Sequence, residues 1–189
     1  MKHEIQLITQ RIMSLPDSGR PLLIALDGRC ASGKTTLSQR LAEELSCAVI
    51  HADDFFLRPE QRTAERMEQA GGNIDYERLL EEVILPLKKG MPFSYRPYSC
   101  EIQALAEPVE VIPRKINLIE GSYCCHPTLW EHYDMRIFMT APKDLRLRRI
   151  AERNGDMLSR FENLWIPLEE KYFSAFDIEQ RCDVIINCV

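Results

Sequence analysis

The sequence predicts an α/β fold in which a parallel sheet is flanked by helices. Short apolar runs alternate along the chain with stretches of helical spacing, and there is no internal repeat or linker. Runs such as Leu22–Leu26 are continuously apolar, which is typical of parallel strands buried on both faces. The 189 residues, 45% of them hydrophobic and 28% charged, fit one globular unit. We therefore expect residues 1–189 to form a single domain.

The first element is predicted to be an amphipathic helix. Ile5, Ile8 and Ile12 recur at helical spacing, and charged residues interrupt the apolar positions between them. Such a mixture lacks the uninterrupted apolar core of a signal peptide.

The remaining elements follow in chain order. Further helices are expected at Thr35–Leu45, Arg58–Glu68 (exposed), Tyr76–Leu87 (stopped near Pro86 and Gly90), Lys143 to about Arg153 and Phe161–Phe176, and buried strands at Leu22–Leu26, Cys47–Ile50, Ile116–Ile119, Met135–Met139 and Asp183–Ile186. Phe93–Tyr98 and Val109–Ile112 predict a small β excursion spanning approximately 92–113. Because the carboxyl ends of parallel strands meet at one edge, residues 27–28, 53–54 and 120–121 should share one site.

The stretch DGRCASGKTT, from Asp27 to Thr36, fits the pattern G-x-x-x-x-G-K-[ST]. Glycines at positions 28 and 33 let backbone N–H groups surround an anion at the positive end of the next helix. Lys34 would reach the β- and γ-phosphates of a nucleotide, and the Thr35 hydroxyl would ligate Mg²⁺. The expected nucleotide-binding residues are Gly28, Arg29, Cys30, Ala31, Ser32, Gly33, Lys34, Thr35 and Thr36. The sequence thus predicts a P-loop nucleotide-binding fold.

Carboxylates follow two of the other predicted strands. On an extended backbone Asp53 and Asp54 would point to opposite sides, so one of them would face the ligand. That carboxylate could take the proton from an attacking hydroxyl or hold a metal-bound water, whereas an Asp-Asp pair by itself also fits a helix cap or turn. Glu120 could orient Mg²⁺, or could be an exposed residue at a strand end.

Arginines gather around the turn at 154–156. Arg146, Arg149 and Arg153 would share one helix face, at i, i+3 and i+7, with Arg148 and Arg160 nearby. This face could close over the phosphates and neutralise the transferred group. A solvated basic face is the alternative interpretation.

Composition excludes several classes of function. A net charge of −5 argues against nucleic-acid binding, and no apolar run is long enough for a membrane span. The seven cysteines are scattered and form no pair of C-x-x-C motifs, so we expect no zinc site and reduced thiols in a cytoplasmic protein. A homo-oligomer is left open by the sequence.

With these residues in place, the chain resembles the uridine kinase family of P-loop phosphotransferases, which is related to phosphoribulokinase, pantothenate kinase and nicotinamide riboside kinase. The resemblance runs from about Leu22 to Ile186, and LDGRCASGKTT is similar to the family's G-x-S/A-x-S-G-K-T-T loop. HADDFF resembles D-S-F-Y, which implies that Asp53 is the general base. LIEGSY resembles F-E-G-I/L, which implies that Glu120 is the Mg²⁺-associated carboxylate, and CDVII is similar to A-D-V-I-I.

The resemblance also implies residues for the phosphate acceptor. GNIDYERLL is similar to N-F-D-H-P, which assigns Asp75 to the ribose hydroxyls, and YRPYSCE resembles P-x-Y-D, which assigns Tyr98, with Arg96 beside it, to the base. RLRRIAERNGD resembles the helix entering a small lid, expected at approximately 150–165. There Arg149 matches the family's arginine, while Arg153 and Arg160 correspond by position and charge. The chain departs from the family pattern at Phe56, at Ser99 and in a shorter lid without G-R-D.

The leading hypothesis is therefore phosphoryl transfer from ATP, with Mg²⁺, to the primary hydroxyl of a nucleoside, as in uridine or cytidine kinases. Another small alcohol, such as a vitamin precursor or a sugar phosphate, is an alternative acceptor. A nucleotide-dependent regulatory NTP-binding protein is a different class, although the chain has no N-K-x-D guanine motif. A degenerate, non-catalytic nucleotide-binding protein is a third possibility.

Overall fold

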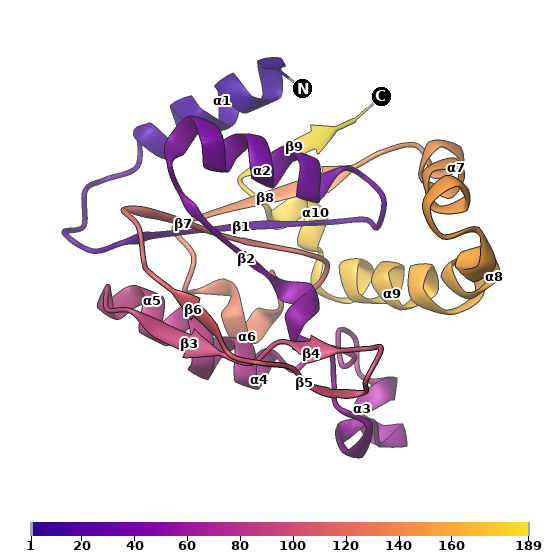
Figure 1. The fold of residues 1–189 in the computed structure, drawn as a ribbon. Coiled ribbons are helices and arrows are strands. Elements are labelled where there is room, and N and C mark those ends of the chain that lie inside the picture. Colours follow the sequence, from indigo (N-terminus) through magenta and orange to yellow (C-terminus); the bar gives the residue numbers. More distant parts are fainter. Residues whose placement is uncertain (1, 189) are drawn as a thin grey trace.

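A five-stranded parallel sheet forms the centre of the computed structural model, which describes residues 2–188 (Figure 1). The strands lie in the order β2-β7-β1-β8-β9, and every neighbouring pair is parallel. Their bounds are β1 (Leu22–Gly28), β2 (Ala48–His51), β7 (Ile116–Glu120), β8 (Met135–Thr140) and β9 (Val184–Asn187). The predicted α/β fold with a parallel sheet flanked by helices is confirmed.

Burial differs between the central and the edge strands. All residues of β1 and β7 are buried, as expected for the central strands of a parallel sheet. Asn117 interrupts the apolar run of β7, and its buried side chain is satisfied by hydrogen bonds with the backbone of Arg114. In β2 only Ile50 is buried, and in β9 burial alternates. The expectation of fully buried strands at 47–50 and 183–186 was therefore wrong, because both strands lie at an edge of the sheet where one side has no neighbouring strand.

Residues of β1 alternate between two apolar cores, one on each face of the sheet. Leu22, Ile24 and Leu26 belong to the core under α1 (Lys2–Met13) and α2 (Lys34–Leu45). Leu23 and Ala25 belong to the core on the opposite face. That face is covered by α4 (Tyr76–Leu79), α5 (Leu85–Lys89), α6 (Pro127–Trp130), α9 (Ile166–Phe176) and α10 (Ile178–Arg181). The predicted first helix is confirmed.

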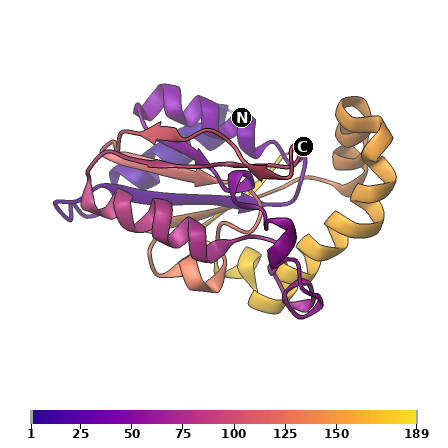
Figure 2. The ribbon, with the colours of Figure 1, turned by 60° about the horizontal axis from the view of Figure 1, so that its bottom comes forward.

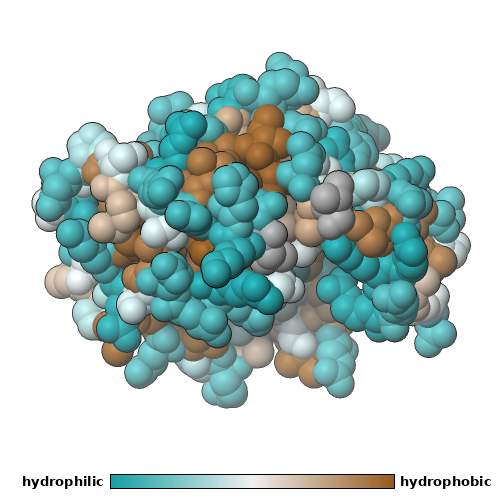
Figure 3. Space-filling view, turned by 90° about the horizontal axis from the view of Figure 1, so that it is seen from above, coloured by the Kyte–Doolittle hydropathy of each residue, from teal (hydrophilic) through white to brown (hydrophobic). Residues whose placement is uncertain are grey.

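The outer face of the α1 and α2 layer is mostly hydrophilic, with a small apolar area towards its middle (Figure 3). Across residues 2–188, no helix combines the length and the apolar character that crossing a bilayer requires.

Two predicted helices differ from the structure. Arg58–Glu68 is a 3₁₀ turn at Pro59–Gln61 followed by α3 (Ala64–Glu68), because Thr63 caps the second segment by accepting the Arg66 N–H. The helix expected at Tyr76–Leu87, stopped near Pro86 and Gly90, is less regular than expected: it contains a π turn at Leu80–Ile84. It ends with α5, whose C-cap is Gly90, as expected. A proline within the first turn of a new helical segment needs no N–H, so Pro86 is tolerated there.

The predicted β excursion consists of two antiparallel pairs. β3 (Phe93–Tyr95) pairs with β6 (Val109–Val111), as expected. Between them, β4 (Tyr98–Ser99) and β5 (Ala104–Leu105) form a second pair that the sequence analysis did not predict.

The segment predicted as the lid, approximately 150–165, lies within a curved helical run at one end of the sheet (Figure 2). It comprises α7 (Lys143–Asn154), a 3₁₀ turn at Gly155–Met157, α8 (Leu158–Arg160), a π turn at Phe161–Trp165, and α9. The run is therefore helical from α7 to α9, with its irregular turns in the middle.

Candidate active site

Three strands end side by side where the predicted site residues lie. Leu26 of β1 and His51 of β2 are both in register with Glu120, the last residue of β7. The segments that follow these strands therefore meet at one edge of the sheet. This placement agrees with the sequence expectation for residues 27–28, 53–54 and 120–121.

The loop between β1 and α2 depends on two glycines. Gly28 has a φ of 137°, and a Cβ added to it would lie 2.0 Å from the Met139 carbonyl oxygen. Gly33 has a φ of 108° and precedes α2 without a side-chain cap. The first N–H groups of α2 consequently have no side-chain acceptor at the cap position, as an anion site at a helix N-terminus requires.

Lys34 is buried, and its ammonium lies across the loop. The Nζ donates to the Gly28 carbonyl oxygen at 2.7 Å and to the Arg29 carbonyl oxygen at 3.1 Å, and lies 3.3 Å from Ser122 Oγ. The positive charge is thus fixed inside the loop that the sequence assigns to phosphate.

Two side chains with oxygen atoms suited to a metal ion, those of Thr35 and Glu120, lie close together at the start of α2. Thr35 Oγ1 donates to Glu120 Oε1 at 3.3 Å, and Glu120 is buried. The same Oε1 lies 2.6 Å from His51 Nδ1, and this hydrogen bond raises the pKa of His51. A hydroxyl and a carboxylate beside a polyphosphate loop are the donors that Mg²⁺ prefers, so this pair fits the ion.

Asp53 and Asp54 lie in a 3₁₀ turn, Ala52–Phe55, and not on the extended backbone that we expected. Their side chains nevertheless have different surroundings. Asp54 accepts a hydrogen bond from Tyr95 Oη at 2.6 Å. Asp53 is exposed, and none of the residues that the structure describes donates a hydrogen bond to its carboxylate.

The electrostatic surroundings of Asp53 suit a base. Asp53 reaches solvent, yet the surrounding protein atoms partly desolvate its carboxylate, and this desolvation raises the pKa of the carboxyl group. The negative charges of Glu120 and Glu169 raise this pKa further. Lys34 acts in the opposite direction and lowers this pKa. A Cβ on Gly121 would lie 3.3 Å from Asp53 Oδ1, so the glycine leaves space beside the carboxylate.

Of the predicted arginines, Arg146 and Arg149 donate to the P-loop. Arg146 Nη1 donates to Cys30 Sγ at 3.9 Å, and Arg149 makes two closer contacts. Its guanidinium donates to the Ala31 carbonyl oxygen at 3.0 Å and to the Ser32 carbonyl oxygen at 3.2 Å. Arg146 is buried and donates to the backbone of Ala141. The other three side chains have different environments: Arg148 is exposed, Arg153 bonds Asn154, and Arg160 lies over the Trp165 ring. Arg146 and Arg149 therefore share a face towards the P-loop, whereas Arg153 bonds elsewhere and does not extend this face in the structure.

Arg29, which was expected to bind nucleotide, has its guanidinium engaged elsewhere. It forms ion pairs with Glu170 at 2.7 Å and Glu179 at 2.9 Å, and it lies over the rings of Phe138 and Phe173. The side chain of Arg29 is therefore held by these contacts, and its backbone is the part that can contribute to nucleotide binding in the P-loop.

Asp75, expected to hold the ribose, already has internal partners. It caps α4 by accepting the Arg78 N–H at 3.1 Å, and its second oxygen accepts from Gln61 Nε2 at 2.7 Å. Its own N–H donates to the Phe55 carbonyl oxygen at 2.7 Å, which places Asp75 directly behind the turn that carries Asp53.

The two residues expected near the base also have internal partners. Tyr98 is buried, and its hydroxyl accepts from Arg62 at 2.7 Å. Arg96 donates to the carbonyl oxygens of Leu105 and Ala106, so its side chain links the segment before β4 to the end of β5.

Sequence reasoning missed Glu169 and Ser122. Glu169 is buried, accepts from Ser122 Oγ at 2.6 Å and accepts the Cys30 N–H at 3.0 Å. One signal was present in the sequence: in the helix that we predicted, Glu169 falls on the same face as Ile166 and Phe173, at i−3 and i+4. A glutamate on an apolar helix face needs a partner.

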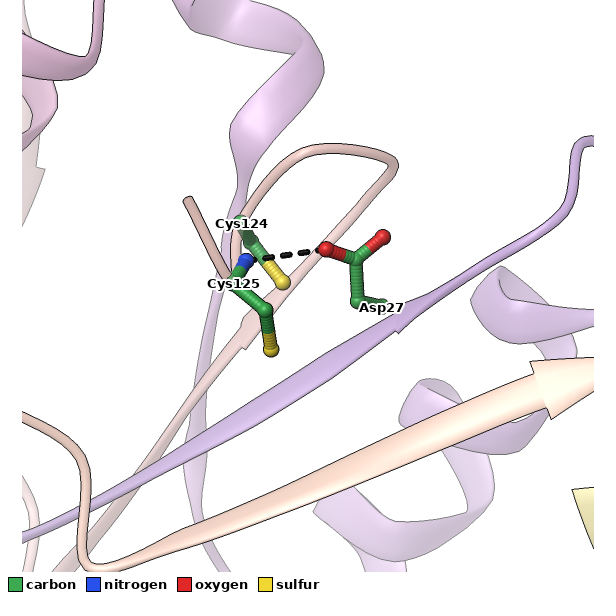
Figure 4. Close-up of side chains that lie close together, drawn as sticks. All are labelled: Asp27, Cys124 and Cys125. Carbon is green, nitrogen blue, oxygen red and sulfur yellow. Dashed lines mark hydrogen bonds between the residues drawn. The ribbon is translucent and has the colours of Figure 1, made fainter. Parts of the chain in front are cut away.

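Asp27, Cys124 and Cys125 lie close enough together to hold a metal ion (Figure 4). However, Asp27 already accepts four hydrogen bonds: from Gly28 N, Tyr123 N, Cys125 N and Tyr172 Oη. Burial raises the pKa of Asp27 to about 6. These bonds tie the turn after β7 to the base of the P-loop, so the cluster is structural.

The sequence profile of the phosphoribulokinase/uridine kinase family matches residues 23–162. The chain belongs to this family. Kinases of this family phosphorylate small alcohols and use ATP, usually with Mg²⁺. The predicted resemblance to the uridine kinase family is thereby confirmed.

Individual relatives carry different substrate names. The chain is 30% identical over 162 residues to nicotinamide riboside kinase 2 of Mus musculus, covering 80% of this chain and 79% of the relative. It is 28% identical over 148 residues to the uridine kinase of Latilactobacillus sakei subsp. sakei (strain 23K), covering 74% and 69%. The solved structure of a possible uridine kinase from Bacillus stearothermophilus shares the fold, with a TM-score of 0.73 at 20% identity and 98% of both chains covered.

Proposed function

We propose that this kinase transfers the γ-phosphoryl group of ATP to the primary hydroxyl of a ribonucleoside, with uridine and cytidine as the leading acceptors. One observation carries the proposal: the Asp53 carboxylate is accessible, accepts no hydrogen bond from the described residues and lies within electrostatic reach of Lys34 in the P-loop. Both curated relatives described above are named for nucleoside substrates.

The chemistry is divided among few side chains. Asp53 accepts the proton of the attacking hydroxyl, and its raised pKa makes it a better base than an ordinary surface carboxylate. Lys34 and the N–H groups at the start of α2 stabilise the charge that develops on the phosphate oxygens. Thr35 and Glu120 would hold Mg²⁺, which supplies further positive charge to the phosphates.

In this proposal the acceptor binds against the wall that carries Asp75 and Tyr98. Hydroxyl groups of the sugar replace Gln61 as donors to Asp75, and the base lies beside Tyr98, with Arg96 in the same segment. Arg149 stays at the loop, while Arg153 and Arg160 approach when the lid closes and exclude water from the reacting groups.

A second candidate acceptor is another small alcohol, such as a vitamin precursor or a sugar phosphate. This candidate is favoured because the two residues proposed to contact a nucleoside already have hydrogen-bond partners within the protein. Gln61 donates to the Asp75 carboxylate, and Arg62 donates to the Tyr98 hydroxyl. An acceptor that needs neither residue would leave both bonds intact.

The test is an ADP-release assay with ATP and Mg²⁺ against nucleosides, nicotinamide riboside, pantothenate and phosphorylated sugars, with a no-acceptor control. We expect turnover with a ribonucleoside, and loss of turnover in the Lys34→Ala variant. Asp75→Ala should raise the KM of a nucleoside but not that of an unrelated alcohol. Rapid ADP release without any acceptor would instead indicate a hydrolase or a nucleotide-dependent switch.

A further inference from the structure

Glu169 connects the helices beyond the lid to the P-loop. Its charge helps to raise the pKa of Asp53, but the proposed mechanism gives no role to its hydrogen bonds. It lies on α9 with only 4% of its surface exposed. One carboxylate oxygen accepts the Cys30 N–H at 3.0 Å, and the other accepts from Ser122 Oγ at 2.6 Å. Both contacts are made to segments that bound the phosphate site.

The hydrogens available at Ser122 decide how this group acts. A serine hydroxyl has one proton to donate and two lone pairs to accept. The carboxylate of Glu169 at 2.6 Å is a closer and stronger acceptor than the Gly28 carbonyl oxygen at 3.2 Å, so the proton is directed to Glu169. The lone pairs of Ser122 Oγ are then free to accept from Lys34 Nζ, 3.3 Å away.

We propose that Glu169 is a positioning residue for Lys34: it orients the Ser122 hydroxyl as an acceptor for the ammonium group and fixes the Cys30 N–H at the same time. This inference rests on the proposed nucleotide site but is independent of which alcohol accepts the phosphoryl group. Glu169 touches neither Lys34 nor the proposed reacting groups directly, so its effect depends on Ser122 and the loop backbone.

The conservative variant Glu169→Gln separates this role from simple packing. A carboxylate accepts at both oxygens, whereas an amide has one accepting oxygen and an NH₂ group that only donates. Glutamine has almost the same shape, but in one orientation its NH₂ group meets the Cys30 N–H and that contact is lost. In the other orientation its NH₂ group faces Ser122 and the hydrogen bond is reversed. The Ser122 hydroxyl then uses one lone pair on the amide and turns its proton to the Gly28 carbonyl oxygen, which leaves one lone pair instead of two for Lys34.

The experiment measures the dissociation constant of ATP with Mg²⁺, without acceptor, for the full-length wild type, Glu169→Gln, Ser122→Ala and the double variant. Each single variant should bind ATP about tenfold more weakly, the size expected for one hydrogen bond to a charged group. The double variant should bind within about twofold of Glu169→Gln, because both residues act through one relay. Glu43→Gln, at an exposed position towards the C-terminal end of α2 and outside the lid, is the matched control and should bind like the wild type.

The outcomes distinguish this inference from the proposed function. Unchanged or tighter ATP binding in Glu169→Gln, or losses that multiply in the double variant, would overturn the relay while leaving the kinase proposal intact. A wild type that does not bind ATP would remove the proposed function itself. Thermal unfolding of each variant shows whether it is folded, and Ser122→Ala tests the relay even if Glu169→Gln unfolds.

Discussion

His51 Nδ1 lies 2.6 Å from Glu120 Oε1, so an ion pair joins the carboxyl ends of the neighbouring strands β2 and β7. The histidine side chain is 47% exposed, whereas the glutamate is 6% exposed. His51 therefore orients the Glu120 carboxylate, which is proposed to bind Mg²⁺, from the solvent side of the site.

This pair predicts a pH-dependent contribution to stability. The hydrogen bond to Glu120 raises the pKa of His51 above its value in the unfolded chain. The contribution is therefore complete below roughly pH 6.5 and is lost as the pH rises through the raised pKa. Urea unfolding should show the wild type more stable than His51→Gln by up to about 1 kcal/mol at pH 6, with a smaller difference at pH 9. A difference that grows with pH would contradict the assignment.

Asp53→Asn should lower kcat by roughly 10²–10⁴-fold and leave the dissociation constant of ATP unchanged, because it removes the proposed proton acceptor and no observed contact. Asp54→Asn is the matched control: its amide oxygen can still accept from the Tyr95 hydroxyl, so this variant should change kcat little. Steady-state kinetics and equilibrium ATP binding measure both effects. Full turnover in Asp53→Asn would show that another group accepts the proton.

Gly28→Ala should unfold the protein or destabilise it by about 3 kcal/mol or more, since the new Cβ would meet the Met139 carbonyl oxygen of a paired strand at 2.0 Å. Gly155→Ala provides the comparison. Its φ is −53°, and a Cβ there meets nothing within 4 Å, so it should stabilise the protein by about 0.5–1 kcal/mol. Denaturant unfolding measures both, and equal effects would exclude this explanation.

His126 predicts a loss of stability in acid. Burial lowers the pKa of His126 to about 4, and its ring stacks on Tyr76 with the ring centroids 3.8 Å apart. The folded protein favours the neutral imidazole, whereas the unfolded chain accepts a proton more readily. The free energy of unfolding therefore falls as the pH drops from roughly 6.5 towards 4, by up to about 3 kcal/mol. His126→Asn keeps an acceptor for the Thr128 N–H and should show a shallower loss over this range. Parallel pH profiles of the two proteins would refute the prediction.

The strands and the P-loop could be predicted because their signals are local. An unbroken apolar run specifies β1, and the glycines at 28 and 33 carry the loop conformation in their own φ angles. The family resemblance identified Asp53 and Glu120 as candidates. Their surroundings, such as the 3₁₀ turn at Asp53, come from tertiary structure.

Contacts between distant segments could not be predicted. Glu169 accepts a hydrogen bond from Ser122, which is 47 residues away in sequence. Gln61 donates to Asp75 from a 3₁₀ turn that the sequence predicted to be part of an exposed helix. Likewise, helical periodicity placed Arg146 beside Arg149, but it could not show that the backbone carbonyl of Ala141 would hold Arg146 inside. Each of these outcomes depends on where separate elements pack.

The lid run is bound to the P-loop near both of its ends. Arg149 of α7 donates to the carbonyl oxygens of Ala31 and Ser32, and Glu170 of α9 pairs with Arg29. A segment held at two points can bend between them but cannot rotate as a rigid unit about one end. Any movement of this run must therefore be absorbed between residues 154 and 165, where 3₁₀ and π turns interrupt the regular α-helix.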